Sequence, residues 1–203
     1  GRKNEPISLP VKFPLLLAQG AEGIAVGLST KILPHNFNEL LKACIQILKE
    51  KSFKIYPDFL TGGLIDISQY NRGKRGGRIR IRSHIEVIDK NTLKISSIPY
   101  SVTTSSLIDS IVKANNSGKI KIKSIEDNTA EKIEIIINLV KGVSPDVTID
   151  ALYSFTNCEV SVSPNCCVIN DNKPEFISVN ELLKISTNNT LNYLKLELQH
   201  KLE

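Results

Sequence analysis

The segment that most constrains this chain is a run in which glycines are spaced among apolar side chains and followed at once by a helix-start signal. It extends from Gln19 to Asn36 and is QGAEGIAVGLSTKILPHN. Glycines at positions 20, 23 and 27 allow backbone conformations that a Cβ resists, and they let a ligand or another backbone approach closely. Ile24, a bulky hydrophobic residue, lies between two of these glycines. The pattern predicts a rigid loop that presents Ile24 to a receiving surface.

Hydrophobic periodicity predicts the regular elements around this run. Over 36–50 the apolar side chains recur at helical spacing, and Asn36 with Glu39 gives a capping-box-like start, so we predict an amphipathic helix. Over 78–87 the period changes to two, with isoleucine and valine on one side and polar residues on the other, which predicts one half-buried strand. Further strands are expected over 93–98 and 132–139, and further helices over 105–115 and 146–156.

These elements alternate without a regular βαβ repeat, which predicts an α+β fold with a mixed or antiparallel sheet and flanking helices. A hairpin is expected over 158–177, because Asn170-Asp171-Asn172 supplies turn-forming side chains. Ser178 and Glu181 then form a capping box that opens a helix. The leucines of this helix follow the spacing of a coiled coil: Leu191, Leu194, Leu198 and Leu202. We therefore divide the chain into a domain over 1–177 and the start of a coiled-coil helix over 178–203.

The positive charge of the chain is concentrated in one segment. The net charge of the 203 residues is only +5, yet residues 72–82 contain six Lys or Arg and no Asp or Glu. Arginines that alternate along one strand face can follow a phosphate backbone, and Gly76-Gly77 allows close approach of the main chain. For a single alternating strand, a solvated surface is the simpler interpretation. The charge pattern thus permits a nucleic-acid interface without requiring one.

No arrangement of residues in the sequence indicates a catalytic centre. The histidines are His35, His84 and His200, and the cysteines are Cys44, Cys158, Cys166 and Cys167. The histidines are scattered over different elements, and His35, beside a helix start, is expected to be structural. The cysteines lack C-x-x-C spacing, and the glycine-rich segments lack the phosphate-loop pattern. We expect no catalytic residue, no metal site and no membrane span, in a protein of the reducing cytoplasm.

The glycine-rich run resembles the segment GxxGIAVGMAT-x-IPPHN of the A subunit of bacterial type IIA DNA topoisomerases, the family of DNA gyrase and topoisomerase IV. It departs from that segment at Leu28-Ser29, where the family has Met-Ala, and at Leu33, where the family has proline. Four other segments resemble family motifs in the same order: 9–17 (LPVKFPLLL), 56–63 (YPDFLTGG), 72–82 (RGKRGGRIRIR) and 98–102 (IPYSV). Motifs in the same order over most of the chain are more specific than any one of them.

The resemblance implies that this chain is the tower domain of such a subunit, followed by the start of a coiled coil. In the family, the isoleucine that matches Ile24 is a wedge inserted between base pairs of the bound duplex, one from each subunit of a dimer. We therefore expect Ile24 to intercalate and not to be a buried loop anchor, with Ala25 and Val26 packed beneath it. The expected contacts to the DNA backbone are Thr61, Lys74, Arg75, Arg78 and Arg80. The catalytic Arg-Tyr pair of the family lies upstream of Gly1, and no residue here matches it.

The whole enzyme that the resemblance implies cuts both strands of one duplex through tyrosyl-phosphate bonds, passes a second duplex through and reseals, using ATP. The expected partners are double-stranded DNA, a second A subunit and the B subunit. Mg²⁺ and ATP are expected to act through the B subunit, with no cofactor on this chain. The short stretch from Pro57 to Arg82 favours topoisomerase IV over gyrase. Because the chain contains no methionine, we expect a fragment that is inactive alone.

Three alternatives stay open at this point. One is a fragment of the A subunit of DNA gyrase. The second is a nucleic-acid-binding module without a role in strand passage, and the third is an oligomerisation module that uses the C-terminal helix. DNA binding that weakens steeply with salt distinguishes a DNA-contacting face from an oligomerisation surface, which needs no such dependence.

Overall fold

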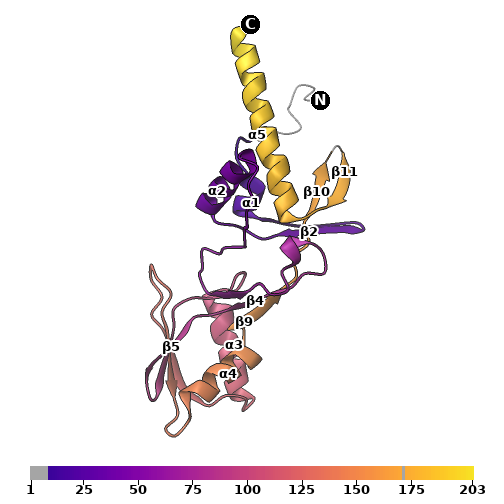
Figure 1. The fold of residues 1–203 in the computed structure, drawn as a ribbon. Helices are drawn as coiled ribbons and strands as arrows, with labels where there is room; N and C mark the ends of the chain where they lie inside the picture. The colour runs from indigo at the N-terminus through magenta and orange to yellow at the C-terminus, as the bar shows by residue number, and fades with distance from the viewer. Residues whose placement is uncertain (1–8, 171) are drawn as a thin grey trace, which may run out of the picture. The chain divides into compact units, whose positions relative to one another are not determined.

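The computed structural model describes residues 9–170 and 172–203, which form two compact units interleaved along the chain (Figure 1). The terminal unit comprises Gly1–Asp58, Tyr70–Gly77 and Ser163–Glu203, and the central unit comprises Phe59–Gln69 and Arg78–Val162. Both units combine helices with antiparallel strand pairs. The predicted α+β class is therefore confirmed.

The core of the central unit lies between a four-stranded antiparallel sheet and two helices. The sheet has the order β5-β6-β8-β7, with β5 at Ile85–Asp89, β6 at Thr92–Ile95, β7 at Ile122–Asp127 and β8 at Ile135–Leu139. Alternate side chains of β6 and β8, such as Leu93 and Ile137, are fully buried. They pack against the apolar faces of α3 (Thr104–Asn116) and α4 (Pro145–Phe155). Period-two and period-3.6 patterns thus meet in one core.

A second, three-stranded sheet of the central unit has the order β3-β4-β9. Its strands are β3 at Leu64–Asp66, β4 at Ile79–Arg82 and β9 at Glu159–Val162. Near it, the rings of Phe59 and Tyr100 stack with their centroids 4.7 Å apart. Because these rings come from two of the segments that resemble family motifs, part of the motif pattern is structural.

The single strand predicted over 78–87 is wrong, because the chain changes partner strands within it. β4 pairs with β3 and β9, whereas β5 pairs with β6. Between them, the N–H of Ser83 donates to the Cys158 carbonyl at 2.8 Å, while the next N–H, of His84, donates to Ser97 Oγ at 2.8 Å. Side-chain alternation continues through such a change, so the sequence pattern alone cannot reveal it.

The terminal unit is built from three helices, two hairpins and a short turn. Its elements are α1 (Leu15–Gln19), β1 (Ala21–Ala25), β2 (Leu28–Ile32), α2 (Phe37–Leu48), the 3₁₀ turn η1 (Asn71–Gly73), β10 (Cys167–Asn170), β11 (Lys173–Phe176) and α5 (Val179–Leu202). Its core joins α1, α2 and the first turns of α5, through buried side chains that include Leu17, Leu40, Val179 and Leu183.

Both predicted helix starts of the terminal unit are confirmed. Asn36 caps α2, because its side chain accepts hydrogen bonds from the N–H groups of Asn38 and Glu39 at 3.0 and 3.3 Å. In α5 the capping box forms in both directions. The Glu181 N–H donates to Ser178 Oγ at 3.2 Å, and the Ser178 N–H donates to the Glu181 carboxylate at 2.7 Å.

The remaining sequence predictions agree with the structure in part. The predicted helices over 105–115 and 146–156 are present as α3 and α4. The hairpin predicted over 158–177 is shorter, because β10 pairs with β11 while β9 pairs with β4. Its turn residue Asp171 lies outside the described residues. The sequence does not indicate β7, since half of the residues of that edge strand are charged.

The two compact units divide the chain differently from the predicted segments 1–177 and 178–203. The boundary at residue 178 coincides with the cap of α5. The first turns of α5, however, bury Val179 and Leu183 in the core of the terminal unit. The helix start is therefore part of a compact unit and not an appendage to it.

His35 has the structural role predicted for it. The side chain is 4% exposed, and its ring bridges two segments of the terminal unit. Nδ1 lies 3.3 Å from the Leu17 carbonyl oxygen and Nε2 lies 3.4 Å from the Tyr70 hydroxyl. In the neutral ring with its proton on Nδ1, Nδ1–H donates to Leu17 and Nε2 accepts from Tyr70. Burial lowers the pKa of His35 to about 4.

Acidification is expected to destabilise the terminal unit through His35. Above pH 6.5 the ring is neutral in both states, and its contribution is fully present. Between pH 6.5 and about 4 only the unfolded ring takes up a proton, so the free energy of unfolding is expected to fall by ~3 kcal/mol over this range. Urea unfolding at pH 7 and pH 4.5 measures the loss. The His35→Gln variant should show a smaller loss, whereas His200→Gln, on the exposed part of α5, should keep all of it. Equal losses in the two variants would refute this assignment.

Candidate nucleic-acid interface

The glycine-rich run folds as a β-hairpin, which corrects the predicted loop. β1 and β2 pair antiparallel with Ala25 opposite Leu28, so Val26 and Gly27 alone form the turn. Gly27 has φ +76°, in the left-handed region that tight two-residue hairpin turns require. The stiffness of the presenting element therefore comes from a hydrogen-bonded ladder.

Ile24 lies one step before the turn and faces solvent. It pairs with Ser29, and its side chain is 91% exposed, while that of Val26 is 103% exposed. The expectation that Ala25 and Val26 pack beneath Ile24 is wrong, because both are exposed on a two-stranded ribbon. Ile24 is not a core anchor of this chain. The hairpin end therefore carries two apolar side chains, and the sequence pattern singled out only one of them.

Asn165, which the sequence analysis missed, fastens the hairpin to the rest of the terminal unit. The Lys31 N–H donates to the Asn165 carbonyl at 2.8 Å, and the Asn165 N–H donates to the Lys31 carbonyl at 2.9 Å. The Asn165 side-chain amide donates to the Ser29 carbonyl at 2.7 Å. No local pattern indicates this contact, because Asn165 is remote in sequence from the hairpin.

Two segments that resemble family motifs meet at the end of the hairpin. His35 forms an antiparallel bridge with Pro57, and the Asp58 N–H donates to the Pro34 carbonyl at 2.9 Å. The Asn36 side-chain amide donates to the Asp58 carboxylate at 2.9 Å. These motif residues hold the hairpin and the start of α2 in a fixed arrangement.

The alternation predicted for the basic segment is present in β4. Ile79 and Ile81 are at most 1% exposed, whereas Arg80 and Arg82 are exposed on the opposite face. Arg78, which precedes the strand, donates from Nε to Ser161 Oγ at 2.5 Å. One face of β4 thus presents a row of guanidinium groups.

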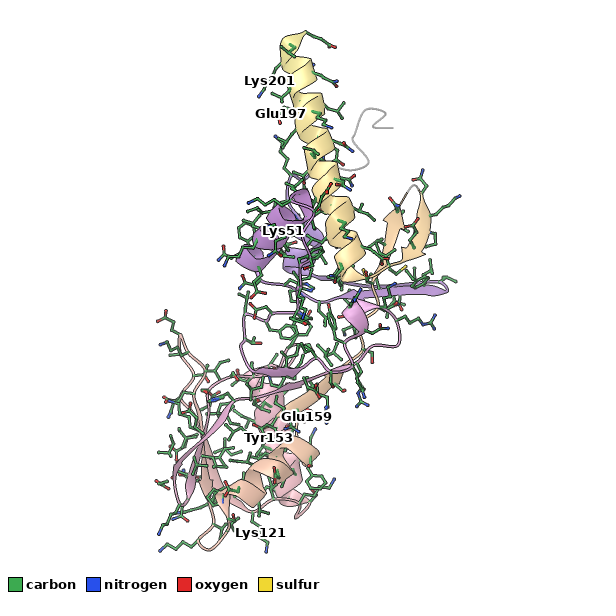
Figure 2. The ribbon with its side chains drawn as sticks, viewed as in Figure 1. Lys51, Lys121, Tyr153, Glu159, Glu197 and Lys201 are labelled. Carbon is green, nitrogen blue, oxygen red and sulfur yellow. The ribbon has the colours of Figure 1, made fainter. Side chains whose placement is uncertain are left out.

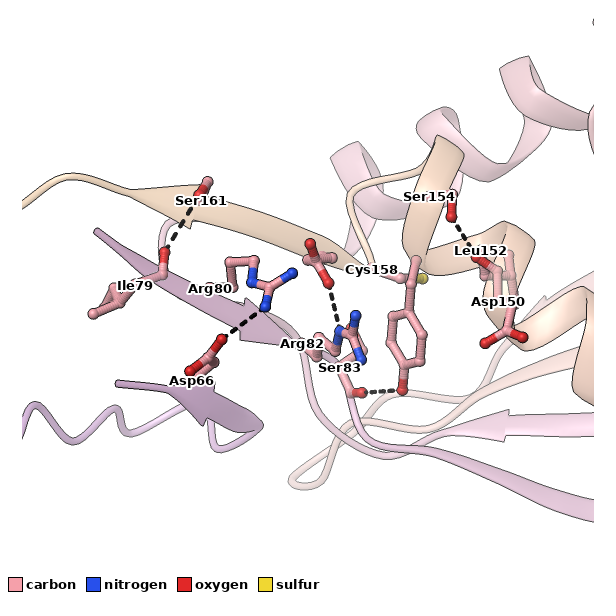
Figure 3. A network of polar contacts seen from close by, with 12 residues as sticks. Asp66, Ile79, Arg80, Arg82, Ser83, Asp150, Leu152, Ser154, Cys158 and Ser161 are labelled. Atoms are coloured by element: carbon pink, nitrogen blue, oxygen red, sulfur yellow. Dashed lines mark hydrogen bonds and ion pairs between the residues drawn. The ribbon is translucent and has the colours of Figure 1, made fainter. Parts of the chain in front are cut away.

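Carboxylates from the two neighbouring strands partly neutralise this row (Figure 3). Arg80 Nη2 donates to Asp66 Oδ2 on β3 at 2.8 Å, and Arg82 forms an ion pair with Glu159 on β9. The Ser68 N–H and the Arg80 guanidinium hold the pKa of Asp66 well below its usual range. Sequence counting over 72–82 missed both acids, because antiparallel pairing brings them in from other segments.

The other expected DNA contacts lie apart from this row. Lys74 and Arg75 belong to the terminal unit, where Lys74 Nζ lies 3.5 Å from Glu181 Oε2 and Arg75 is exposed. Thr61 lies in the central unit, and its hydroxyl oxygen is covered, with no hydrogen-bond partner among the described residues. The structure thus brings the arginines of β4 together and leaves the remaining three expected contacts on separate segments.

A left-handed turn holds Arg72 and Lys74. Asn71 and Arg72 have φ +50° and +52°, and Gly73 has φ +77°. A residue other than glycine in this region costs ~1–3 kcal/mol. A Cβ at Gly73 would lie 2.5 Å from Val179 Cγ2, so the turn packs closely against the start of α5. The sequence gives no sign of this strain.

The described residues contain no assembled catalytic group. Among residues 9–170 and 172–203, no cluster of His, Cys, Asp or Glu is placed to hold a metal ion, and no described helix is long and apolar enough to cross a membrane. Burial raises the pKa of the Cys158 and Cys166 thiols to about 11, so both stay protonated at neutral pH. The Tyr153 hydroxyl donates to the Ser83 carbonyl at 2.9 Å, which gives that tyrosine a structural role.

Comparison with known proteins connects the whole chain with one family. A family model that describes the A subunit of DNA gyrase/topoisomerase IV matches residues 1–203. The A subunit of DNA topoisomerase 4 from Borreliella burgdorferi is 44% identical over 98% of this chain and 32% of the relative. The A subunit of DNA gyrase from Lawsonia intracellularis is 36% identical over 89% of this chain and 24% of the relative. The A subunit of DNA topoisomerase 4 from Rickettsia conorii is 33% identical over all of this chain and 31% of the relative.

These matches define a class of protein that acts on DNA as one part of a topoisomerase. The chain belongs to the A subunits of the bacterial type IIA DNA topoisomerases, the family of DNA gyrase and topoisomerase IV. It spans about a quarter to a third of the length of the relatives described above.

Proposed function

We propose that this chain is the DNA-gate part of a topoisomerase IV A subunit, which binds and bends the duplex to be cut during ATP-dependent strand passage. The observation that carries the proposal is the 91% exposure of Ile24 beside a two-residue hairpin turn. An exposed apolar side chain on a stiff ribbon is suited to enter a base step, since unstacking one step costs only a few kcal/mol. The kink then brings basic surface into contact with the backbone.

Topoisomerase IV is the better-supported paralogue, and the A subunit of gyrase is the alternative. The segment from Pro57 to Arg82 is short, and the Borreliella burgdorferi topoisomerase 4 protein has 44% identity, against 36% for the Lawsonia intracellularis gyrase protein. A DNA-binding module without strand passage stays the second candidate. It is favoured by the row of guanidinium groups on β4, because such a row can bind a phosphate backbone without any cutting chemistry.

The partners we propose follow from the same assignment. They are double-stranded DNA, the B subunit, and another A subunit that supplies the second wedge. Mg²⁺ and ATP act through the B subunit, and the protein works in the cytoplasm. The first turns of α5 are packed in the terminal unit, while its later leucines are exposed, as expected of the start of a coiled coil: Leu191, Leu194, Leu198 and Leu202.

Removing the charges of the basic segment is expected to weaken duplex binding about equally for all DNA sequences. We propose the quadruple variant Lys74→Ala, Arg75→Ala, Arg78→Ala and Arg80→Ala. Each lost phosphate contact should reduce the slope of log affinity against log salt by about 1. Fluorescence anisotropy at several salt concentrations measures the slope. Because Asp66 and Glu181 already pair with two of these cations, a reduction of about 2 is sufficient, and an unchanged slope would contradict the proposal.

The chain by itself is expected neither to relax nor to cleave supercoiled DNA. Both reactions need a nucleophile activated by neighbouring groups, and no described tyrosine has such surroundings. Tyr70 and Tyr153 are instead held protonated, since burial raises the pKa of both hydroxyls. The measurement is a cleavage assay with Mg²⁺ and a B subunit, followed by denaturing electrophoresis. A covalent DNA adduct on any tyrosine of this chain would overturn the prediction.

A further inference from the structure

A cleft in the terminal unit collects cations that neither the hairpin nor β4 explains. Residues 51–56, 70–74 and 178–184 contribute its walls, and the cleft encloses about 770 Å³. Its charged lining residues are five cations and one carboxylate: Lys51, Lys54, Arg72, Lys74, Lys184 and Glu181. Figure 2 labels Lys51 at one end of this set. All three segments belong to the terminal unit, so the cleft lies within one compact unit.

The single carboxylate is engaged within the cleft and leaves most of the positive charge unbalanced. Glu181 accepts hydrogen bonds from the Ser178 N–H and the Ser178 hydroxyl, both at 2.7 Å, and lies 3.5 Å from Lys74 Nζ. Among the described residues, the other four cations form no ion pair. Like charges on one cleft repel each other and attract anions. The cleft is therefore suited to a ligand that carries several negative charges.

The backbone holds two of these cations in place at a cost. Arg72 and Lys74 belong to the left-handed turn described above, and Gly73 within it packs against Val179. Strain of this kind persists where the surrounding structure enforces it, and it is common at functional sites. Three lysines on separate segments, Lys51, Lys54 and Lys184, are exposed around the same cleft. Fixed and flexible cations are thus combined in one site.

We propose that this cleft binds phosphate groups of duplex DNA and forms a second contact region of the terminal unit, separate from the hairpin. The inference rests on the proposed function. Four lysines and one arginine favour phosphates over base edges, because ammonium groups act as point charges without reading sequence. A row of cations on three segments fits consecutive phosphates of a strand. The same unit carries the Ile24 hairpin, so one compact unit would hold both wedge and backbone.

The test is a triple variant of this chain, Lys51→Gln, Lys54→Gln and Lys184→Gln, with a control triple of equal charge change. The control is Lys42→Gln, Lys173→Gln and Lys195→Gln, three exposed lysines of the same unit outside the cleft. Circular dichroism melting confirms that both variants fold. The cleft variant should flatten the salt slope of duplex binding by about 2–3 and weaken binding at least tenfold, whereas the control should change the slope by less than about 1.

The outcomes separate this inference from the proposed function. If the unaltered chain binds and bends DNA, while the cleft variant and the control give equal slopes, the cleft proposal is refuted and the proposed function stands. If the cleft variant loses tripolyphosphate binding but keeps its DNA salt slope, the cleft belongs to a small polyanion and the inference is equally refuted. If the unaltered chain shows no salt-dependent duplex binding, both proposals fail together.

Discussion

Replacing Gly20 by alanine is expected to destabilise the terminal unit by ~2–5 kcal/mol, because left-handed strain and overpacking add at this position. Gly20 has φ +74°. A Cβ there would lie 2.6 Å from the Ile32 carbonyl oxygen and 2.9 Å from the Pro34 nitrogen, and both are backbone atoms. Neither can move without disturbing the end of β2. Urea unfolding followed by circular dichroism measures the loss.

The two other glycines of the hairpin provide matched controls. Gly27 has nearly the same φ, +76°, but nothing lies within 4 Å of its added Cβ, so Gly27→Ala should cost only ~1 kcal/mol of strain. Gly23 has no positive φ, and its nearest neighbour is Thr30 Cγ2 at 3.9 Å, so Gly23→Ala should change stability by less than ~1 kcal/mol. Equal losses at Gly20 and Gly27 would mean that close packing at Gly20 does not matter.

Ile24→Ala is expected to abolish most DNA bending while leaving the fold intact. Truncating an exposed side chain changes stability by within about 0.5 kcal/mol, because no packing is lost. In the full A subunit, bending and cleavage should fall together, while part of the duplex affinity remains from the basic surfaces. End-to-end energy transfer on a labelled duplex measures bending, and thermal melting measures stability.

Ile32→Ala is the matched control for Ile24, since it removes the same atoms from the same hairpin. Ile32 is 3% exposed in the core of the terminal unit, so its truncation should cost ~2–5 kcal/mol. If instead Ile24→Ala lowered the melting temperature as much as Ile32→Ala and left bending normal, Ile24 would be a structural anchor and the wedge proposal would be wrong.

Local sequence rules predicted elements whose stabilising contacts lie within a few residues. Asn36 and Ser178 cap their helices as expected, because a capping side chain bonds N–H groups two or three positions away. The buried side of β4 followed from strict alternation over Ile79–Arg82. The exposure of Ile24 agreed with its place between glycines, although the element proved to be a hairpin. Such features depend on spacing, which is fully present in the sequence.

Other features depend on contacts between residues far apart in the chain. Asn165 fastens the hairpin, and Glu159 faces Arg82 across a strand pair. The partner change at Ser83 and the interleaving of the two units likewise depend on which strands meet. A local pattern states which face of an element is apolar, but not which element covers it.

The sequence by itself determined the family, the class of fold, the helix starts and the exposed isoleucine as the residue to test. Only the tertiary structure decided the electrostatics. It neutralised part of the basic strand with Asp66 and Glu159, covered the hydroxyl of Thr61, and gathered five cations from three segments into one cleft. The physical reason is that charges interact over distance in space, whatever their separation along the chain. Charge counted along a segment therefore predicts a binding surface less well than charge placed by the fold.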